Sequence, residues 1–212
     1  MTLAQSIQQY GETPIPHHVM TWLLQDYRQP NDKIQYLVKD GLLLPVRKGL
    51  YVAGPKITHQ QPDPFLLANH ILGPSYVSLE SALSYYDLIP EKVYETTSVT
   101  TKGSRIYQTP LGVFSYTRLR LPYYSYGIAS VAVSPKQRFL VATPEKALFD
   151  KIIATAGVEL RSRKGALAYL ENDLRIDLDR LKTLNVPAMK EWLVNSPKRT
   201  SLDILVQTIQ QL

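Results

Sequence analysis

The stretch from Leu42 to Val52, with the sequence LLLPVRKGLYV, decides the fold of the N-terminal part of the chain. Two short apolar runs flank the basic turn Arg47-Lys48-Gly49. Aliphatic and β-branched residues on either side of a short turn that ends in glycine are typical of paired strands. The stretch therefore predicts a β-hairpin whose tip carries two cations.

The residues before this hairpin predict a helix that begins at an Asn31 N-cap and ends at Gly41, a natural left-handed residue at a helix end. The apolar residues of this helix recur at helical spacing on one stripe, and they are Ile34, Leu37 and Val38. Two shorter helices are predicted before it, over residues 2–10 and 16–25. Three helices followed by a hairpin predict a winged helix-turn-helix over residues 1–54.

The proline-rich segment 55–64 predicts a linker, because proline removes backbone donors and disfavours helix in the residue before it. The remainder, residues 65–212, is expected to form an α+β domain with a helical tail over about residues 157–212. The segment from Val93 to Val141 is rich in β-branched and aromatic residues and predicts an antiparallel sheet. The predicted fold class is thus α+β, with an N-terminal winged helix, a mixed second domain and a helical C-terminal part.

Helix-start signals mark the second half of the chain. Ser78 opens one predicted helix, and Thr143-Pro144-Glu145 combines an N-cap hydroxyl, a proline at the first helical position and an acid in the first turn. Further helices are expected at about residues 161–172, 178–184, 188–194 and 201–211.

The predicted third helix is the main functional candidate. With its apolar stripe buried, it turns a mixture of basic, amide and phenolic side chains outward, as a helix that enters a DNA major groove requires. The hairpin tip that follows can contact the neighbouring phosphates or the minor groove. The expected DNA-binding residues are Lys33, Gln35, Tyr36, Lys39, Arg47 and Lys48.

The small net charge of the predicted winged-helix unit limits how tightly one copy can bind DNA. Residues 1–60 contain six Lys and Arg against four Asp and Glu, a net charge of only +2. Binding by one copy should be weak and strongly dependent on salt, so a second copy or additional basic residues are expected to help. The candidates for a secondary nucleic-acid surface are Arg118, Arg120, Arg161, Arg163 and Lys164, which can equally be ordinary solvated surface.

Several kinds of chemistry find no support in the sequence. The chain has no cysteine, and His17, His18, His59 and His70 have no metal-ligand spacing. It has no GxSxG, GxxxxGK[ST] or GxGxxG motif. We expect no catalytic residue, no metal, no cofactor and no enzymatic activity.

The bulk composition is that of an ordinary globular protein. The chain of 212 residues is 44% hydrophobic and 20% charged and has a net charge of +6. No window approaches the roughly 18 uncharged apolar residues of a membrane span, and the first ten residues lack a signal-peptide pattern. A cytoplasmic protein without a membrane partner is expected.

Several motifs, in order, resemble the AbiEi family of antitoxins from bacterial type IV toxin–antitoxin (abortive infection) systems. The resemblance covers about residues 1–155, whereas the final helices match only loosely. The motifs are Asp40-Gly41-Leu42-Leu43, Val46-Arg47-Lys48-Gly49-Leu50-Tyr51, Ser81-Ala82-Leu83-Ser84-Tyr85-Tyr86, Leu88-Ile89-Pro90-Glu91, Ser98-Val99-Thr100-Thr101-Lys102, Thr109-Pro110-Leu111-Gly112 and Ala142-Thr143-Pro144-Glu145-Lys146-Ala147-Leu148-Phe149-Asp150.

The resemblance implies a winged helix that represses the protein's own operon, with Arg47 and Lys48 of the wing in contact with DNA. It also implies a second domain that opposes a nucleotidyltransferase toxin without forming a tight complex with it. Since the chain has one small DNA-binding unit, we expect paired binding at an inverted repeat in its own promoter. The resemblance names no residue that carries the antitoxin activity.

Two other functions remain open from the sequence. One is a plain winged-helix regulator whose second domain binds a ligand or a protein. The other is a nuclease that the winged helix targets to DNA, with acids such as Glu80, Asp87, Glu91 and Glu95 as its candidate residues, although these are spread over a helix and a loop.

Overall fold

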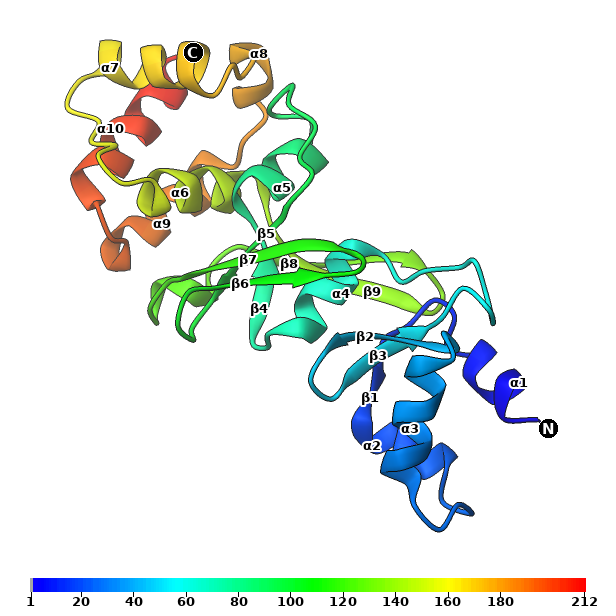
Figure 1. Cartoon of the computed structure of the whole chain (residues 1–212). Coiled ribbons are helices and arrows are strands. Elements are labelled where there is room, and N and C mark those ends of the chain that lie inside the picture. Colours follow the sequence, from blue (N-terminus) through cyan, green and yellow to red (C-terminus); the bar gives the residue numbers. More distant parts are fainter. Residues whose placement is uncertain (1) are drawn as a thin grey trace.

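The computed structural model describes residues 2–212 and shows an α+β protein (Figure 1). Its N-terminal part contains a three-stranded antiparallel sheet in the order β1-β3-β2, packed against short helices. The elements of this part are α1 (Leu3–Gln8), β1 (Ile15–Pro16), α2 (His17–Leu23), α3 (Pro30–Lys39), β2 (Leu43–Arg47) and β3 (Leu50–Ala53).

The helix before the hairpin starts earlier than the sequence predicted. Gln29 is the N-cap of α3 and Pro30 occupies the first helical position, so the prediction of Asn31 as the N-cap is wrong. Proline fits the first turn because its missing N–H has no helical partner there and its φ is already helical. Gly41, with φ of +72°, follows the C-cap as predicted.

The N-terminal helices and one face of the small sheet enclose their own hydrophobic cluster. Ile34 and Leu37 of α3 are buried in it, which confirms two of the three residues in the predicted stripe, while Val38 is only partly buried. The other fully buried members are Ile7, Ile15, Met20, Leu24, Leu43 and Ala53. This cluster fixes which face of α3 points to solvent.

The β2–β3 hairpin has the tight turn that the sequence predicted. Lys48 and Gly49 form the turn, and Gly49 adopts a φ of +79°, which L-residues with a Cβ rarely take. The face of the hairpin that carries Val46, Leu50 and Val52 packs into the hydrophobic core of the larger part of the chain. The hairpin therefore contributes to both hydrophobic clusters and joins them.

A six-stranded sheet forms the centre of the larger part, in the order β6-β7-β5-β4-β9-β8 (Figure 1). The strands are β4 (Ser75–Val77), β5 (Thr96–Thr100), β6 (Arg105–Thr109), β7 (Gly112–Arg118), β8 (Ile128–Ser134) and β9 (Gln137–Ala142).

The predicted antiparallel sheet is wrong in one respect, because this sheet is mixed. β5 pairs in parallel with β7, and β4 pairs in parallel with β9. The β5–β7 pair is parallel because the β6–β7 hairpin folds back so that β7, rather than β6, lies beside the buried strand β5. Short-range strand patterns cannot show which strand of a hairpin lies next to a third strand.

Helices cover both faces of the sheet. On one face lies α4 (Pro64–Ile71), where the Tyr116 hydroxyl of β7 donates to the Ala68 carbonyl at 2.6 Å. On the other face lie α5 (Leu79–Tyr85) and α6 (Pro144–Ala154), which begin after β4 and β9. α6 starts as predicted, with the Thr143 hydroxyl accepting from the Lys146 N–H.

The C-terminal part is helical, as predicted, and packs beyond α6 (Figure 1). Its helices are α7 (Arg163–Ala168), η2 (Tyr169–Asp173), α8 (Leu178–Leu181), α9 (Val186–Trp192), η3 (Leu193–Asn195) and α10 (Arg199–Gln210). Within residues 2–212, none of the helices combines the length and the apolar character that crossing a membrane requires.

The start of α4 provides a direct test of the fold. The Asp63 carboxylate accepts a hydrogen bond of 2.8 Å from the Phe65 N–H and caps the helix. Replacing such a cap with alanine removes an acceptor for an otherwise unpaired N–H, so Asp63→Ala should lower the free energy of unfolding by about 1 kcal/mol. Urea denaturation measures this change. Asp26→Ala, at an exposed site without a cap, is the control, and equal losses in both variants would contradict the capping role.

Candidate nucleic-acid interface

The outward face of α3 carries most of the predicted groove-reading residues. Gln35, Tyr36 and Lys39 are exposed, with Tyr36 exposed to 57%. They lie opposite the buried residues Ile34 and Leu37, because a helix turns by about 100° per residue. The face combines an amide, a phenol and an ammonium group, all of which can contact DNA.

Lys33 differs from these three because it is only half exposed. Its Nζ lies 4.8 Å from the centroid of the Tyr36 ring and 5.3 Å from that of Tyr27. The electron-rich ring faces attract the cation and hold it at the first turn of α3. Lys33 is thus positioned by two tyrosines.

The hairpin tip presents the two predicted cations. Arg47 is the last residue of β2 and Lys48 lies in the turn, and both are exposed. Burial raises the pKa of Tyr116, and the nearby Arg47 partly opposes this shift. Arg47 therefore lies close to the larger sheet, which is consistent with the contact between β2 and β6.

The acids of the N-terminal part do not all act as free charges. The Asp40 carboxylate pairs with Lys56 Nζ at 3.3 Å, although both side chains remain accessible to solvent. Asp26 and Asp32 are exposed. Pairing of Asp40 removes part of the repulsion that phosphates would meet beside the end of α3.

Three of the five secondary basic residues lie far from α3. Arg161, Arg163 and Lys164 lie around the start of α7, at the opposite end of the molecule from α3 (Figure 1). Arg161 pairs with Glu159 at 2.7 Å, and Arg163 donates to the Gln211 side chain at 2.7 Å. Arg118 and Arg120 are exposed at the end of β7.

A buried charge cluster on α6 was not predicted from the sequence. The Lys146 ammonium and the Asp150 carboxylate form an ion pair of 2.7 Å, and both side chains are 0% exposed. The carboxylate also accepts hydrogen bonds from the hydroxyls of Tyr123 (2.7 Å), Tyr76 (2.9 Å) and Ser78 (2.7 Å). The Lys146 ammonium lies 3.3 Å from the centroid of the Tyr123 ring and donates to the Tyr123 carbonyl.

The protonation states of this cluster follow from its surroundings. Burial lowers the pKa of Lys146 to about 8, and the Asp150 carboxylate opposes this effect. The ammonium therefore remains charged at neutral pH. Burial and the same carboxylate raise the pKa of Tyr76 and of Tyr123, so both phenols remain hydrogen-bond donors. Their hydrogen bonds join β4, the start of α5 and α6 to the segment around Tyr123.

A signal for this cluster was present in the sequence. Lys146 and Asp150 are spaced i, i+4, so they lie on the same side of α6. Apolar residues occupy most of the other positions of the helix, and its buried residues include Ala147, Leu148 and Ile152. An opposite-charge pair within a helix that is apolar on nearly all sides indicates a buried pair.

The tyrosine run 123–126 also packs inside. Tyr123 and Tyr124 are buried, and the Tyr126 ring is stacked on Trp192 with a centroid distance of 6.3 Å. Tyr123 and Tyr124 thus belong to the core and Tyr126 packs against it, whereas Ser125 is exposed.

The candidate nuclease carboxylates do not assemble into one site. Glu80 pairs with Lys151 of α6, and Glu91 pairs with Arg175. In the part of the chain that the structure describes, no three His, Asp or Glu side chains come together as metal ligands would.

Comparison with known proteins does not place the chain in a family. No model of a known protein family matches the sequence, and no curated protein is significantly similar to it.

Removing Lys146 tests the buried ion pair. Lys146→Met leaves the Asp150 carboxylate buried without its cation, and breaking a buried pair in this way typically costs about 3–5 kcal/mol. Lys151→Met, on the same helix, breaks a pair with Glu80 that is partly open to solvent and should cost about 0–1 kcal/mol. Urea denaturation compares the two variants. A loss for Lys146→Met no larger than that for Lys151→Met would show that the pair is not important for stability.

Alkaline pH tests the buried phenols. Burial raises the pKa of several tyrosines, including Tyr124 to about 12, above the value of 10.0 that applies when they are exposed. Above about pH 10 the unfolded chain loses phenol protons that the folded chain retains, so the free energy of unfolding should fall as pH rises from 10 towards 12. The lowered pKa of Lys146 has the opposite effect, because between pH 8 and 10.5 the folded chain has lost this proton while the unfolded chain retains it, so the free energy of unfolding rises. This is one group, whereas several tyrosines contribute to the fall.

Tyr124→Phe should make this fall less steep, because it removes one shifted phenol. Urea denaturation at several pH values gives the slope. Tyr94→Phe is the matched control, since the Tyr94 side chain is 86% exposed. A free energy of unfolding that is constant between pH 10 and 12 would contradict the role of the buried tyrosines.

Proposed function

We propose that this protein is a DNA-binding transcriptional autorepressor, and that it also acts as an antitoxin against a nucleotidyltransferase toxin. The observation that carries the DNA-binding part is the exposed face of α3 followed directly by a basic hairpin tip. The antitoxin part rests on the resemblance to the AbiEi family.

The order of elements in the N-terminal part supports a winged helix-turn-helix. Three helices, a short β1 before α2 and the β2–β3 hairpin after α3 follow one another as they do in that fold. The strand order β1-β3-β2 agrees with it as well. In this interpretation α3 is the recognition helix and the hairpin is the wing.

The proposed roles follow from the exposed chemistry. Gln35 and Lys39 contact base edges, since an amide pairs with adenine and an ammonium with guanine O6 and N7. Arg47 and Lys48 contact backbone phosphates. Lys33, held by its two tyrosines, adds a cation at the first turn of the helix.

Two copies are proposed to bind one operator. A unit with a net charge of +2 neutralises few phosphates, and the basic residues near α7 lie too far from α3 to extend its surface (Figure 1). An inverted repeat in the promoter would recruit a second copy and double the number of contacts.

Fluorescence anisotropy tests the DNA-binding part. A duplex from upstream of the gene and a shuffled duplex of the same composition are titrated with the protein over a series of salt concentrations. We expect tighter binding to the upstream duplex, with an affinity that falls steeply as salt rises. Equal, weak binding to both duplexes that salt abolishes would reduce the proposal to nonspecific electrostatics.

Two variants separate the proposed contacts. Arg47→Ala should weaken binding to both duplexes and lower the slope of log affinity against log salt by about 0.9, the loss of one phosphate contact. Lys39→Ala should weaken binding to the upstream duplex more than to the shuffled one, by about 1–3 kcal/mol. Lys190→Ala is the control, because this exposed residue lies on α9, at the other end of the molecule from α3 (Figure 1). Unchanged affinity in either test variant would remove that residue from the interface.

Toxin rescue tests the antitoxin part. A nucleotidyltransferase encoded beside this gene is expressed with and without the protein, and growth is compared. Rescue that persists in Arg47→Ala would assign antitoxin activity to a surface other than the wing. An isolated gene, or no rescue, would favour a plain regulator.

A further inference from the structure

The strand β8 forms one edge of the six-stranded sheet, and among the strands of residues 2–212 it pairs only with β9. Its seven residues, IASVAVS, include no charged residue, no proline and no glycine. Proteins usually protect an edge strand with such residues or cover it, because its free N–H and C=O groups can pair with another strand. The opposite edge strand, β6, has this protection, since it begins with Arg105 and contacts β2 of the N-terminal part.

Two contacts show which residues of β8 are hydrogen-bonded to β9. The Gly127 carbonyl accepts from the Thr143 N–H at 2.8 Å, so the pair just before β8 is a bonded one. Leu140 lies opposite Ser130, but its N–H and carbonyl both bond to the Asn69 side chain, at 2.6 and 3.3 Å. Bonded and non-bonded pairs alternate in an antiparallel ladder. Ser130 therefore belongs to a non-bonded pair, and its backbone groups point away from the sheet.

The same alternation makes the backbone groups of Ile128 and Ala132 point outward as well. Within residues 2–212, no protein group accepts from the N–H groups of Ile128, Ser130 or Ala132. The Ser130 carbonyl receives Arg138 Nη1 at 3.4 Å, which is longer than the usual N–H···O distance of about 2.7–3.2 Å. The edge thus offers a row of donors and acceptors at every second residue.

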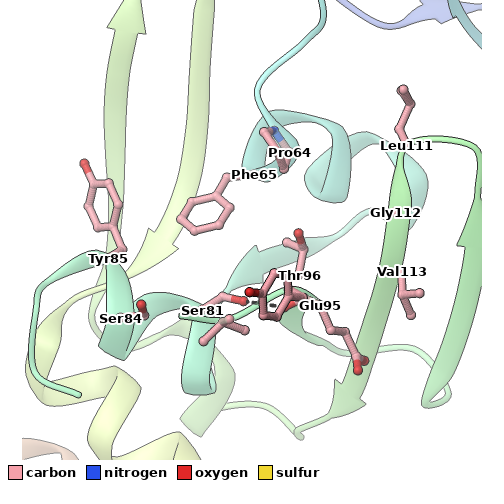
Figure 2. A pocket seen from close by; sticks show the side chains of 12 residues that line it. Pro64, Phe65, Ser81, Ser84, Tyr85, Glu95, Thr96, Leu111, Gly112 and Val113 are labelled. Atoms are coloured by element: carbon pink, nitrogen blue, oxygen red, sulfur yellow. Dashed lines mark hydrogen bonds between the residues drawn. The ribbon is translucent and has the colours of Figure 1, made fainter. Parts of the chain in front are cut away.

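The inner face of β8 is fixed by the core. Val131 is partly buried and lies opposite Phe139 of β9, so both side chains are on the same face of the sheet. The Phe139 ring packs against the rings of Phe65 and Tyr85, with centroid distances of 5.1 and 5.9 Å. Figure 2 shows the latter two rings at the pocket beside the start of β5. Because β8 is already held as a strand, little further ordering is needed when it pairs.

Charge favours a second copy of this chain as the pairing partner. The chain has a net charge of +6, so two copies repel each other over much of their surface. The uncharged strand β8 is a place where they can meet without like charges directly opposite each other. Antiparallel pairing about a two-fold axis also sends the β8–β9 turns, which contain Lys136, to opposite ends of the joint.

We propose that β8 pairs antiparallel with β8 of a second copy, so that the two six-stranded sheets become one continuous sheet. The bulge between Ala132 and Ser134 ends the regular ladder, so residues 128–132 form the joint. A joint this short buries little area, and we expect reversible association with a dissociation constant on the order of 10–100 µM. The role of this dimer rests on the proposed function, since a two-fold dimer matches an inverted repeat in DNA.

Sedimentation velocity of the full chain, without DNA, tests the association. The weight-average sedimentation coefficient should rise from that of a monomer towards that of a dimer between about 5 and 500 µM protein. Amide hydrogen exchange at the two ends of this range locates the joint. Exchange at Ile128, Ser130 and Ala132 should slow by about fivefold at the high concentration, because these N–H groups become bonded. Exchange at Ala129 and Val131, which already bond to β9, should change little.

Variants of Ser130 test the surface, because its side chain is exposed. Ser130→Pro removes one outward donor from each copy and should weaken association by about tenfold or more. Proline is tolerated there because the β8–β9 ladder does not use this N–H. Ser130→Lys places like charges near the two-fold axis and should weaken association by about fivefold. Ile106→Lys, on the other edge strand at a site that is 68% exposed, is the matched control and should have no effect.

A mixture of variants separates lost pairing from misfolding. Ser130→Lys and Ser130→Glu bring opposite charges to the axis when they are combined, so their equimolar mixture should associate more tightly than either variant alone. A misfolded variant would gain nothing from the mixture.

Other outcomes would overturn the β8 joint. These are a sedimentation coefficient that does not change with concentration, association that survives both Ser130→Pro and Ser130→Lys, and a mixture no tighter than its components. Loss of association in Ile106→Lys would place the joint at the other edge of the sheet. None of these measurements uses DNA, so their failure leaves the DNA-binding proposal standing. Conversely, a protein that does not recognise its promoter can still show the β8 joint.

Discussion

The larger part of the structure depends on the ion pair and hydrogen bonds of one buried group, the carboxylate of Asp150. It forms an ion pair with the ammonium of Lys146 on its own helix. It also accepts hydrogen bonds from hydroxyl groups on β4, at the start of α5 and in the segment around Tyr123. Such a group is costly to bury unless its lone pairs are all used, and here four donors use them. Because the donors Tyr76 and Ser78 lie 74 and 72 residues before Asp150 in the chain, the cluster requires one particular arrangement of sheet and helices.

The β2–β3 hairpin has a comparable role between the two parts of the molecule. One of its faces covers the small N-terminal cluster, and the residues Val46, Leu50 and Val52 pack into the larger core. The proposed wing is therefore held by apolar contacts on both sides, and only its tip is free to reach a phosphate. The close approach of Gly54 to the Gly41 carbonyl tightens the base of the hairpin, where an added Cβ would lie 2.2 Å from that oxygen.

The sequence by itself determined the local elements: the basic hairpin with Gly49 in its turn, the start of α6 at Thr143, the amphipathic face of α3 and the helical end of the chain. These follow from turn chemistry, caps and periodicity, which act between residues a few positions apart. Only the tertiary structure decided the mixed strand order, the burial of Lys146 with Asp150, and the distance of Arg161 and Arg163 from α3. Each of these depends on which distant segments come together, and that is decided by the packing of whole faces, which local patterns do not encode.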